Sequence, residues 1–170
     1  MSYLEQEISE KIALLLACAK IWDEKLKDIE KASKYYAEIV TLDDTHSYSV
    51  DRLLKIYRQQ EKWNELAKIY EKKISITDSS EETIVLAFEL GSVYRDSIKS
   101  LSKAIEIYQD ILSLDFSELN AIYALKELYL RISNFEALEQ TMKMECSLVD
   151  DKETKKTLLL QMGRICEEKL

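Results

Sequence analysis

The sequence repeats itself at an interval of 72 residues. Residues 12–74 align without gaps on residues 84–146, and the identical residues recur at helical spacing in both copies. Most of these identities are apolar, and they include Ile12/Ile84, Leu14/Leu86, Ala32/Ala104, Tyr36/Tyr108, Ile39/Ile111, Leu53/Leu125, Tyr57/Tyr129 and Leu66/Leu138. A fixed period of this kind predicts stacked structural units instead of one closed core.

The composition points to an all-α fold. Apolar residues make up 46% of the chain and charged residues 33%, which argues against disorder. Proline is absent, and the glycine-punctuated alternation of β proteins is missing. A net charge of −8 argues against a nucleic-acid footprint over the whole chain.

Apolar residues spaced three and four apart predict about nine helices. The first is expected from about Glu5 to Glu24, and its buried stripe is formed by Ile8, Ile12, Leu15, Ala19 and Trp22. Polar residues before the later helices are candidate N-caps, three of them with a glutamate three positions on. These caps are Asp44 or Thr45, Ser79 with Glu82, Ser117, Ser133 with Glu136, and Asp150 with Glu153, and the second helix is expected to start near Asp28.

The two glycines, Gly91 and Gly163, also lie 72 residues apart and inside helical patterns. A glycine within a helix costs about 1 kcal/mol relative to alanine. We therefore expect both glycines to face a closely packed neighbouring helix, as one device used twice.

The stretch Leu90-Gly91-Ser92-Val93-Tyr94, followed by Ala104 and Tyr108, resembles the tetratricopeptide repeat. In that family helix A reads Leu-Gly-x2-Tyr and helix B reads Ala-x3-Phe. The position that ends each helix-A signature falls at Trp22, Tyr57, Tyr94, Tyr129 and Cys166. The odd-numbered repeats carry one extra residue between this position and helix B, because Trp22 precedes Ala32 by ten positions and Tyr57 precedes Leu66 by nine.

The resemblance implies an α-solenoid, a right-handed superhelix of antiparallel helix pairs in one domain spanning 1–170. Four repeats are expected at about 5–43, 44–78, 79–115 and 116–150, followed by an unpaired final helix at 151–170. Because that helix has no partner, we expect either a fragment of a longer repeat protein or a chain that covers this end by self-association.

The resemblance also implies a function, since helix A of each repeat lines a concave face on which a peptide commonly lies. The expected partner is a peptide or helix with apolar anchors and some acidic residues. Leu16 and Phe88 could equally pack between neighbouring A helices. The predicted partner-binding residues are Leu16, Lys20, Tyr48, Lys55, Phe88, Ser92, Arg95, Tyr123, Glu127 and Arg131.

One specialised family site is absent from the pattern. Chaperone-docking members grip a C-terminal carboxylate with Lys and Asn on one A helix, Asn on the next, and Lys and Arg on the third. The matching positions here are Leu16, Lys20, Arg52, Val85 and Glu89. Starting one repeat later gives Asp51, Lys55, Glu89, Asn120 and Ala124, so neither register makes the clamp.

No pattern of catalytic residues or metal ligands stands out, and no cofactor is expected. His46, the only histidine, lies beside Asp44 and Thr45 at a helix start, which favours a surface or capping role. The acidic pairs at 43–44 and 150–151 lack the spacing of a calcium loop and are interpreted as caps. Cys18, Cys146 and Cys166 fall on apolar helical faces and are expected as reduced core thiols.

Two alternatives to a protein-binding scaffold remain open. Residues 51–73 hold seven cations and four acids, which fits RNA binding by a related helical repeat, or a solvated helix surface. Self-assembly through the final helix is the other alternative. The longest unbroken apolar run, Ile12–Ala19, is far shorter than the roughly 20 residues that cross a bilayer, so we expect a cytoplasmic protein.

Overall fold

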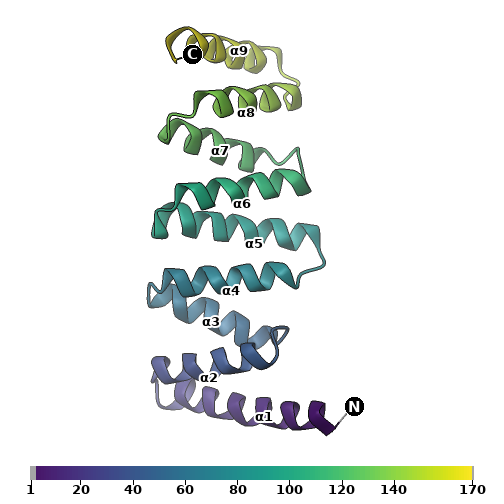
Figure 1. Cartoon of the computed structure of the whole chain (residues 1–170), viewed down its shortest axis with the longest axis vertical. Helices are drawn as coiled ribbons and strands as arrows, with labels where there is room; N and C mark the ends of the chain where they lie inside the picture. The colour runs from purple at the N-terminus through teal and green to yellow at the C-terminus, as the bar shows by residue number, and fades with distance from the viewer. Residues whose placement is uncertain (1–2, 170) are drawn as a thin grey trace. The chain divides into compact units, whose positions relative to one another are not determined.

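The computed structural model describes residues 3–169, apart from the side chains of Cys166, Glu168 and Lys169, and this part of the chain contains helices and no strand (Figure 1). The all-α prediction is therefore confirmed. The helices are α1 Tyr3–Lys20, η1 Ile21–Lys25, α2 Ile29–Leu42, α3 Ser47–Gln59, α4 Trp63–Ser75, α5 Ser80–Ser92, η2 Val93–Ile98, α6 Leu101–Leu114, α7 Leu119–Arg131, α8 Phe135–Leu148 and α9 Lys152–Lys169.

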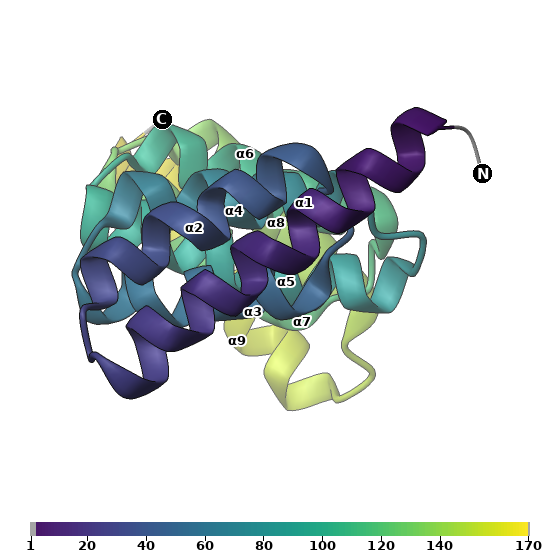
Figure 2. The same ribbon diagram turned by 90° about the horizontal axis from the view of Figure 1, so that it is seen from below.

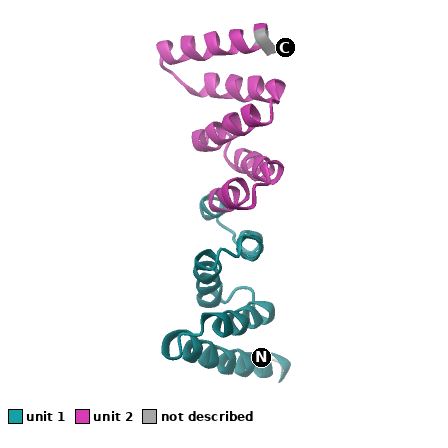
Figure 3. Ribbon diagram, turned by 90° about the vertical axis from the view of Figure 1, so that its left-hand side faces the viewer, with its two compact units in different colours: residues 1–86 teal, residues 87–170 magenta. Residues whose placement is uncertain are grey.

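The chain divides into two compact units, residues 1–86 and 87–170, with the boundary inside α5 (Figure 3). Within unit 1, α1 packs on α2, α2 on α3 and α3 on α4, and Figure 2 shows α1 and α2 side by side. Within unit 2, η2 packs on α6, and α6 to α9 each pack on the next. Packing between chain neighbours is the pattern of a helical repeat. We call α1, α3, α5, α7 and α9 the A helices, and α2, α4, α6 and α8 the B helices.

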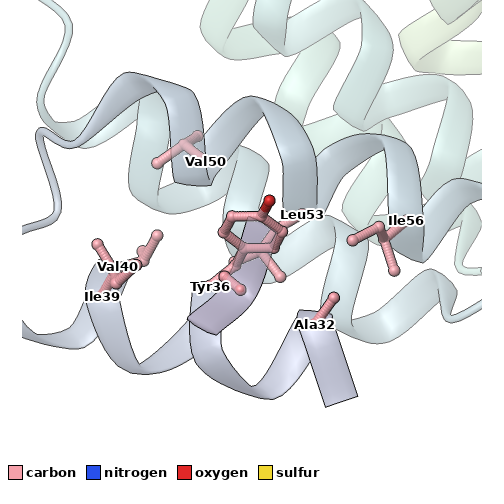
Figure 4. Packing of buried hydrophobic residues seen from close by; sticks show 8 residues of the cluster. Ala32, Tyr36, Ile39, Val40, Val50, Leu53 and Ile56 are labelled. Atoms are coloured by element: carbon pink, nitrogen blue, oxygen red, sulfur yellow. The ribbon is translucent and has the colours of Figure 1, made fainter. Parts of the chain in front are cut away.

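The core of unit 1 lies between α2 and α3. Ala32, Tyr36 and Ile39 are fully buried on α2, and they meet Leu53 and Ile56 of α3 (Figure 4). Ile12, Leu15 and Trp22, on the predicted stripe of the first helix, are partly buried against the same cluster. Each buried aliphatic or aromatic side chain contributes about 1.5–3 kcal/mol to folding.

The core of unit 2 repeats this arrangement. Ala104, Tyr108 and Ile111, the counterparts of Ala32, Tyr36 and Ile39, are 0%, 1% and 0% exposed on α6. On α7, Leu125 and Leu128 are likewise buried. These residues of α2 and α6, which lie 72 positions apart in the sequence, are thus buried to the same extent.

The extra residue of the odd-numbered repeats forms a wide, π-helical turn. These turns are η1 and η2, which lie at corresponding places after α1 and α5. In η1 the Leu26 N–H donates to the Ile21 carbonyl at 2.9 Å, an i to i+5 bond. A π turn absorbs one inserted residue without ending the helix, and it redirects the side chains that follow.

The turn from each A helix to its B helix contains one non-glycine residue with positive φ. These residues are Lys27 (56°), Glu61 (54°), Lys99 (64°) and Ser133 (56°). They pair up at the 72-residue interval, so the same left-handed turn closes every helix pair. This conformation costs an ordinary residue about 1–2 kcal/mol.

The predicted cap Ser79 is confirmed, because the Glu82 N–H donates to Ser79 Oγ at 3.3 Å. At the expected start of the second helix, the Lys31 N–H donates to Asp28 Oδ1 at 3.0 Å. His46 has the capping role, because its Nδ1 accepts the Ser49 N–H at 3.3 Å.

Other caps lie one to two residues beyond the predicted ones. His46 replaces Asp44 or Thr45 at α3, Glu118 replaces Ser117 at α7, Asn134 replaces Ser133 at α8, and Asp151 replaces Asp150 before α9. The residues that were predicted as caps lie instead in the turns before these helices. Asp115 Oδ1 accepts the N–H of Ser117, Asp43 Oδ1 accepts that of Thr45, and Ser133 occupies the left-handed turn.

The expected equivalence of the glycines is wrong. A Cβ at Gly91 would lie 2.8 Å from Tyr108 Cζ, so that glycine does admit a close neighbour. A Cβ at Gly163 would meet nothing within 4 Å. The two positions match in sequence, but only Gly91 has a ring packed over it.

The expectation for the cysteines is also wrong in part. Cys18 is exposed on α1 instead of lying in the core, and Cys146 is half-buried; both are free thiols. The side chain of Cys166 lies outside the described residues. The apolar run Ile12–Ala19 therefore includes exposed positions as well as buried ones.

We predict that Gly91→Leu lowers the free energy of unfolding by about 1–3 kcal/mol, because the new side chain would displace the buried Tyr108 ring. Gly163→Leu is the matched control, and it should leave stability unchanged or raise it by up to about 1 kcal/mol through helix propensity. Urea unfolding followed by circular dichroism measures both. Equal losses in the two variants would contradict the assigned packing.

We also predict that Glu61→Gly raises the free energy of unfolding by about 1 kcal/mol, because glycine adopts the positive φ without strain. Lys68→Gly, on the exposed side of α4, should instead lower it by about 1 kcal/mol. Thermal melts of the two variants give opposite shifts if the turn is strained, and shifts of the same sign if it is not.

Candidate functional site

The ten predicted residues all lie on A helices or the π turn that continues one, in two groups. Unit 1 contains Leu16 and Lys20 on α1 with Tyr48 and Lys55 on α3. We call these four residues the unit-1 face. Unit 2 contains the unit-2 face, which consists of Phe88 and Ser92 on α5, Arg95 on η2, and Tyr123, Glu127 and Arg131 on α7.

Lys20 and Tyr48 come together in the unit-1 face. The Lys20 ammonium lies 4.9 Å from the centroid of the Tyr48 ring, within the range of a cation–π interaction. Tyr48 is 40% exposed, and its ring stands edge-on to Tyr36 at 6.1 Å. The face therefore presents an accessible aromatic ring with a cation above it.

Asp23, which sequence reasoning did not single out, is only 4% exposed and contacts Tyr36, against which the Tyr48 ring packs. Its Oδ2 accepts the Tyr36 hydroxyl at 3.1 Å and Arg52 Nε at 2.9 Å, and Arg52 Nη2 also donates to it. One carboxylate thus joins η1, α2 and α3. The signal in the sequence was the inserted residue, because the resulting π turn directs Asp23 inward.

The pKa directions agree with this geometry. The hydrogen bond to Asp23 raises the pKa of Arg52 above its ordinary value. Burial, followed by the neighbouring Tyr48 and the Asp23 charge, raises the pKa of Tyr36. Arg52 and Tyr36 therefore stay protonated as donors at neutral pH, which keeps this junction intact.

The other two members of the unit-1 face differ in accessibility. Lys55 is exposed and forms no ion pair within the described part of the chain. It borders a hollow of about 260 Å³ together with Asp51 and Tyr70. Leu16 is half-buried and packs against the core cluster, in agreement with the alternative interpretation of this residue.

Several cations of the basic segment 51–73 make internal contacts. Lys73 pairs with Asp51 at 3.1 Å, and Lys72 Nζ donates to the Val40 carbonyl at 2.7 Å. Arg58 Nη2 donates to the Tyr70 hydroxyl at 2.7 Å. The ion pair neutralises Lys73, and the two hydrogen bonds hold Lys72 and Arg58 to groups of the protein itself.

In the unit-2 face, Phe88 and Ser92 are engaged by neighbouring groups. The Phe88 ring packs on Tyr108 with centroids 5.9 Å apart. The Ser92 hydroxyl donates to the Phe88 carbonyl at 2.9 Å, within the same helix. Tyr123 is the accessible aromatic of this face at 47% exposed, with the Lys126 ammonium 5.6 Å from its ring centroid.

The cations of the unit-2 face are balanced by neighbouring acids. Arg95 donates from Nε and Nη2 to the Asp96 carboxylate at 2.9 and 2.8 Å, which raises the pKa of Arg95 and lowers that of Asp96. Arg131 pairs with Glu127 at 2.6 Å. The two faces thus differ in charge, because Lys20 and Lys55 form no such pairs within residues 3–169.

The described residues contain no group of three or more His, Cys, Asp or Glu side chains placed to hold a metal ion. None of the described helices is both long enough and apolar enough to span a membrane.

No protein-family model matches the sequence, and no curated protein matches it either. Solved structures do resemble it. PilF of Pseudomonas aeruginosa shares 14% identity at a TM-score of 0.53, over 91% of this chain and 68% of that one. YrrB, a TPR protein with an unusual peptide-binding site, shares 14% sequence identity at a TM-score of 0.50. The match covers 86% of this chain and 75% of YrrB. A tetratricopeptide repeat protein from Parabacteroides merdae shares 17% at 0.55, over 94% of this chain but only 63% of its own length.

We predict that Arg52→Met lowers the free energy of unfolding by about 3 kcal/mol, because it leaves the buried Asp23 carboxylate without a cation. The double variant Asp23→Leu/Arg52→Met should regain most of that loss. Lys11→Ala, which breaks the exposed pair with Glu38, is the control and should cost less than about 1 kcal/mol. Urea unfolding measures all three, and a double variant as unstable as Arg52→Met would contradict the assigned ion pair.

Proposed function

Because the chain has the tetratricopeptide-repeat fold, we propose that it is a non-catalytic cytoplasmic scaffold that binds a partner peptide or helix through the faces of its A helices. YrrB, which has the same fold, has a peptide-binding site, and this supports a peptide as the class of partner. The contacts that support peptide binding lie mostly in the unit-1 face.

The observation that carries the proposal is the exposed Tyr48 ring with Lys20 above it. Tyrosine is enriched among the interface residues that dominate binding energy. Asp23 and Tyr36 fix the surrounding helices from below, so the pair is held on a rigid base. A rigid site loses less entropy on binding than a loop does.

The charges indicate what kind of peptide suits each face. Lys20 and Lys55 favour acidic residues at the unit-1 face. At the unit-2 face the Arg95–Asp96 and Arg131–Glu127 pairs leave little net charge, so Tyr123 is expected to contact an apolar residue. An acidic peptide segment therefore suits the unit-1 face, and an apolar segment suits the unit-2 face.

Selection from a phage-displayed random peptide library, followed by fluorescence anisotropy on the selected peptides, tests the proposal. The variant Tyr48→Ala/Tyr123→Ala should bind selected peptides at least about tenfold more weakly, a loss of about 1.4 kcal/mol. Phe88 is left unchanged because its ring packs on Tyr108.

The matched control is Phe116→Ala/Leu130→Ala, which removes two exposed apolar side chains outside both faces. It should bind within about twofold of the unaltered chain. Selected peptides that bind the tyrosine variant as tightly as the control would exclude the A-helix faces as the binding site.

A further inference from the structure

An open groove of about 630 Å³ lies along α1 from Glu5 to Leu16, beside the turn between α2 and α3. Its apolar lining is formed by Ile8, Ile12 and Leu16 of α1 and by Leu42 at the end of α2. We call this the α1 groove. Its volume falls within the roughly 300–1,000 Å³ typical of binding pockets.

The three apolar residues of α1 recur every four positions, so they form a ridge on one side of the helix. The ridge from Ile8 to Leu16 is about 12 Å long at 1.5 Å per residue. A straight ridge two turns long matches the apolar stripe of another α-helix, whose side chains also recur every three or four positions.

The polar edge of the groove is acidic. Glu5, Asp43 and Asp44 border it, and no lysine or arginine among the described residues does. Lys72 lies 3.9 Å from Asp44 in an exposed pair. Such pairs are weak in water, so the edge keeps a net negative charge.

Comparison with the residues 72 positions later shows which of these three acidic residues belongs to the repeated turn. Asp43 and its counterpart Asp115 both accept bonds from the residue two positions on, so this acid belongs to the repeated turn. Glu5 and Asp44 correspond to Thr77 and Phe116, which carry no charge. Their acidity is therefore not a requirement of the fold.

We propose that the α1 groove binds a basic amphipathic helix of a partner protein. Leucine-like side chains of that helix occupy the lining of Ile8, Ile12, Leu16 and Leu42, and flanking lysines or arginines meet Glu5 and Asp44. The ligand is opposite in charge to the acidic peptide expected at the unit-1 face. The groove adjoins the unit-1 face at Leu16, and the two favour ligands of opposite charge.

A synthetic helix of Leu and Lys, about 15 residues long, is the probe, with binding measured by fluorescence anisotropy. Two comparison peptides control for charge and shape: one with the same composition in scrambled order, and one with Glu in place of Lys. Both should bind at least about tenfold more weakly than the amphipathic Leu/Lys helix. Equal binding of the scrambled peptide would show attraction by charge alone and overturn the proposal.

The variant Glu5→Lys/Asp44→Lys should bind the Leu/Lys helix at least about tenfold more weakly. The matched control is Glu7→Lys/Glu10→Lys, which makes the same change in net charge on α1 outside the groove. It should bind within about twofold of the unaltered chain. Equal losses in the two variants would overturn the proposal.

A second pair of variants tests the groove by shape. Ala13 is exposed and lines the groove, whereas Ala17 is exposed on α1 and does not. Ala13→Arg should abolish binding of the Leu/Lys helix, and Ala17→Arg should not. Self-association of the chain that Ala13→Arg abolishes would assign the groove to a second copy of this protein and overturn the partner helix.

The variant Tyr48→Ala/Tyr123→Ala separates the two proposals. It should bind the Leu/Lys helix normally, because neither tyrosine lines the α1 groove. Loss of this binding in the tyrosine variant would overturn the α1 groove as a separate site, whatever the outcome of the peptide selection.

Discussion

The buried tyrosine of the first B helix in each unit is the contact on which the rest of the packing depends. Tyr36 and Tyr108 are 0% and 1% exposed, and each ring must lie against a small residue on the A helix beside it. In unit 2 that residue is Gly91, where even a Cβ would lie 2.8 Å from the ring. In unit 1 the matching residue is Ala19, also fully buried in the cluster of Tyr36. The tyrosine thus sets how closely the helices approach.

Both units contain the inserted residue, but the π turns that it forms give them binding surfaces of different charge. In both units it forms a π turn, but this turn carries Asp23 in unit 1 and Arg95 at the corresponding place in unit 2. Asp23 is buried under Tyr36 and Arg52, which leaves Lys20 at the surface beside Tyr48. Arg95 stays near the surface and pairs with Asp96. A charge reversal at one repeated position therefore separates a cationic face from a balanced one.

Much of the fold could be predicted because period and burial are properties of the sequence pattern. The stripe of Ala32, Tyr36 and Ile39 and its copy on α6 required only helical spacing. The caps at α7 and α8 could not be placed to the residue, since Asp115 and Ser133 take part in turns whose backbone geometry decides which side chain reaches the free N–H groups. The exposure of Cys18 could not be predicted, because it lies inside an unbroken apolar run in which the pattern does not show which positions are buried.

The sequence by itself determined the all-α class, the 72-residue repeat, the place of the inserted residue and the B-helix core, because apolar periodicity dictates which face of a helix is buried. Only the tertiary structure decided that Gly91 admits a ring while Gly163 meets open space, that Asp23 joins three helices, and that the α1 groove has an acidic edge. These features depend on distances between side chains of different helices. Two identical residues that lie one repeat apart in the sequence can therefore have different neighbours.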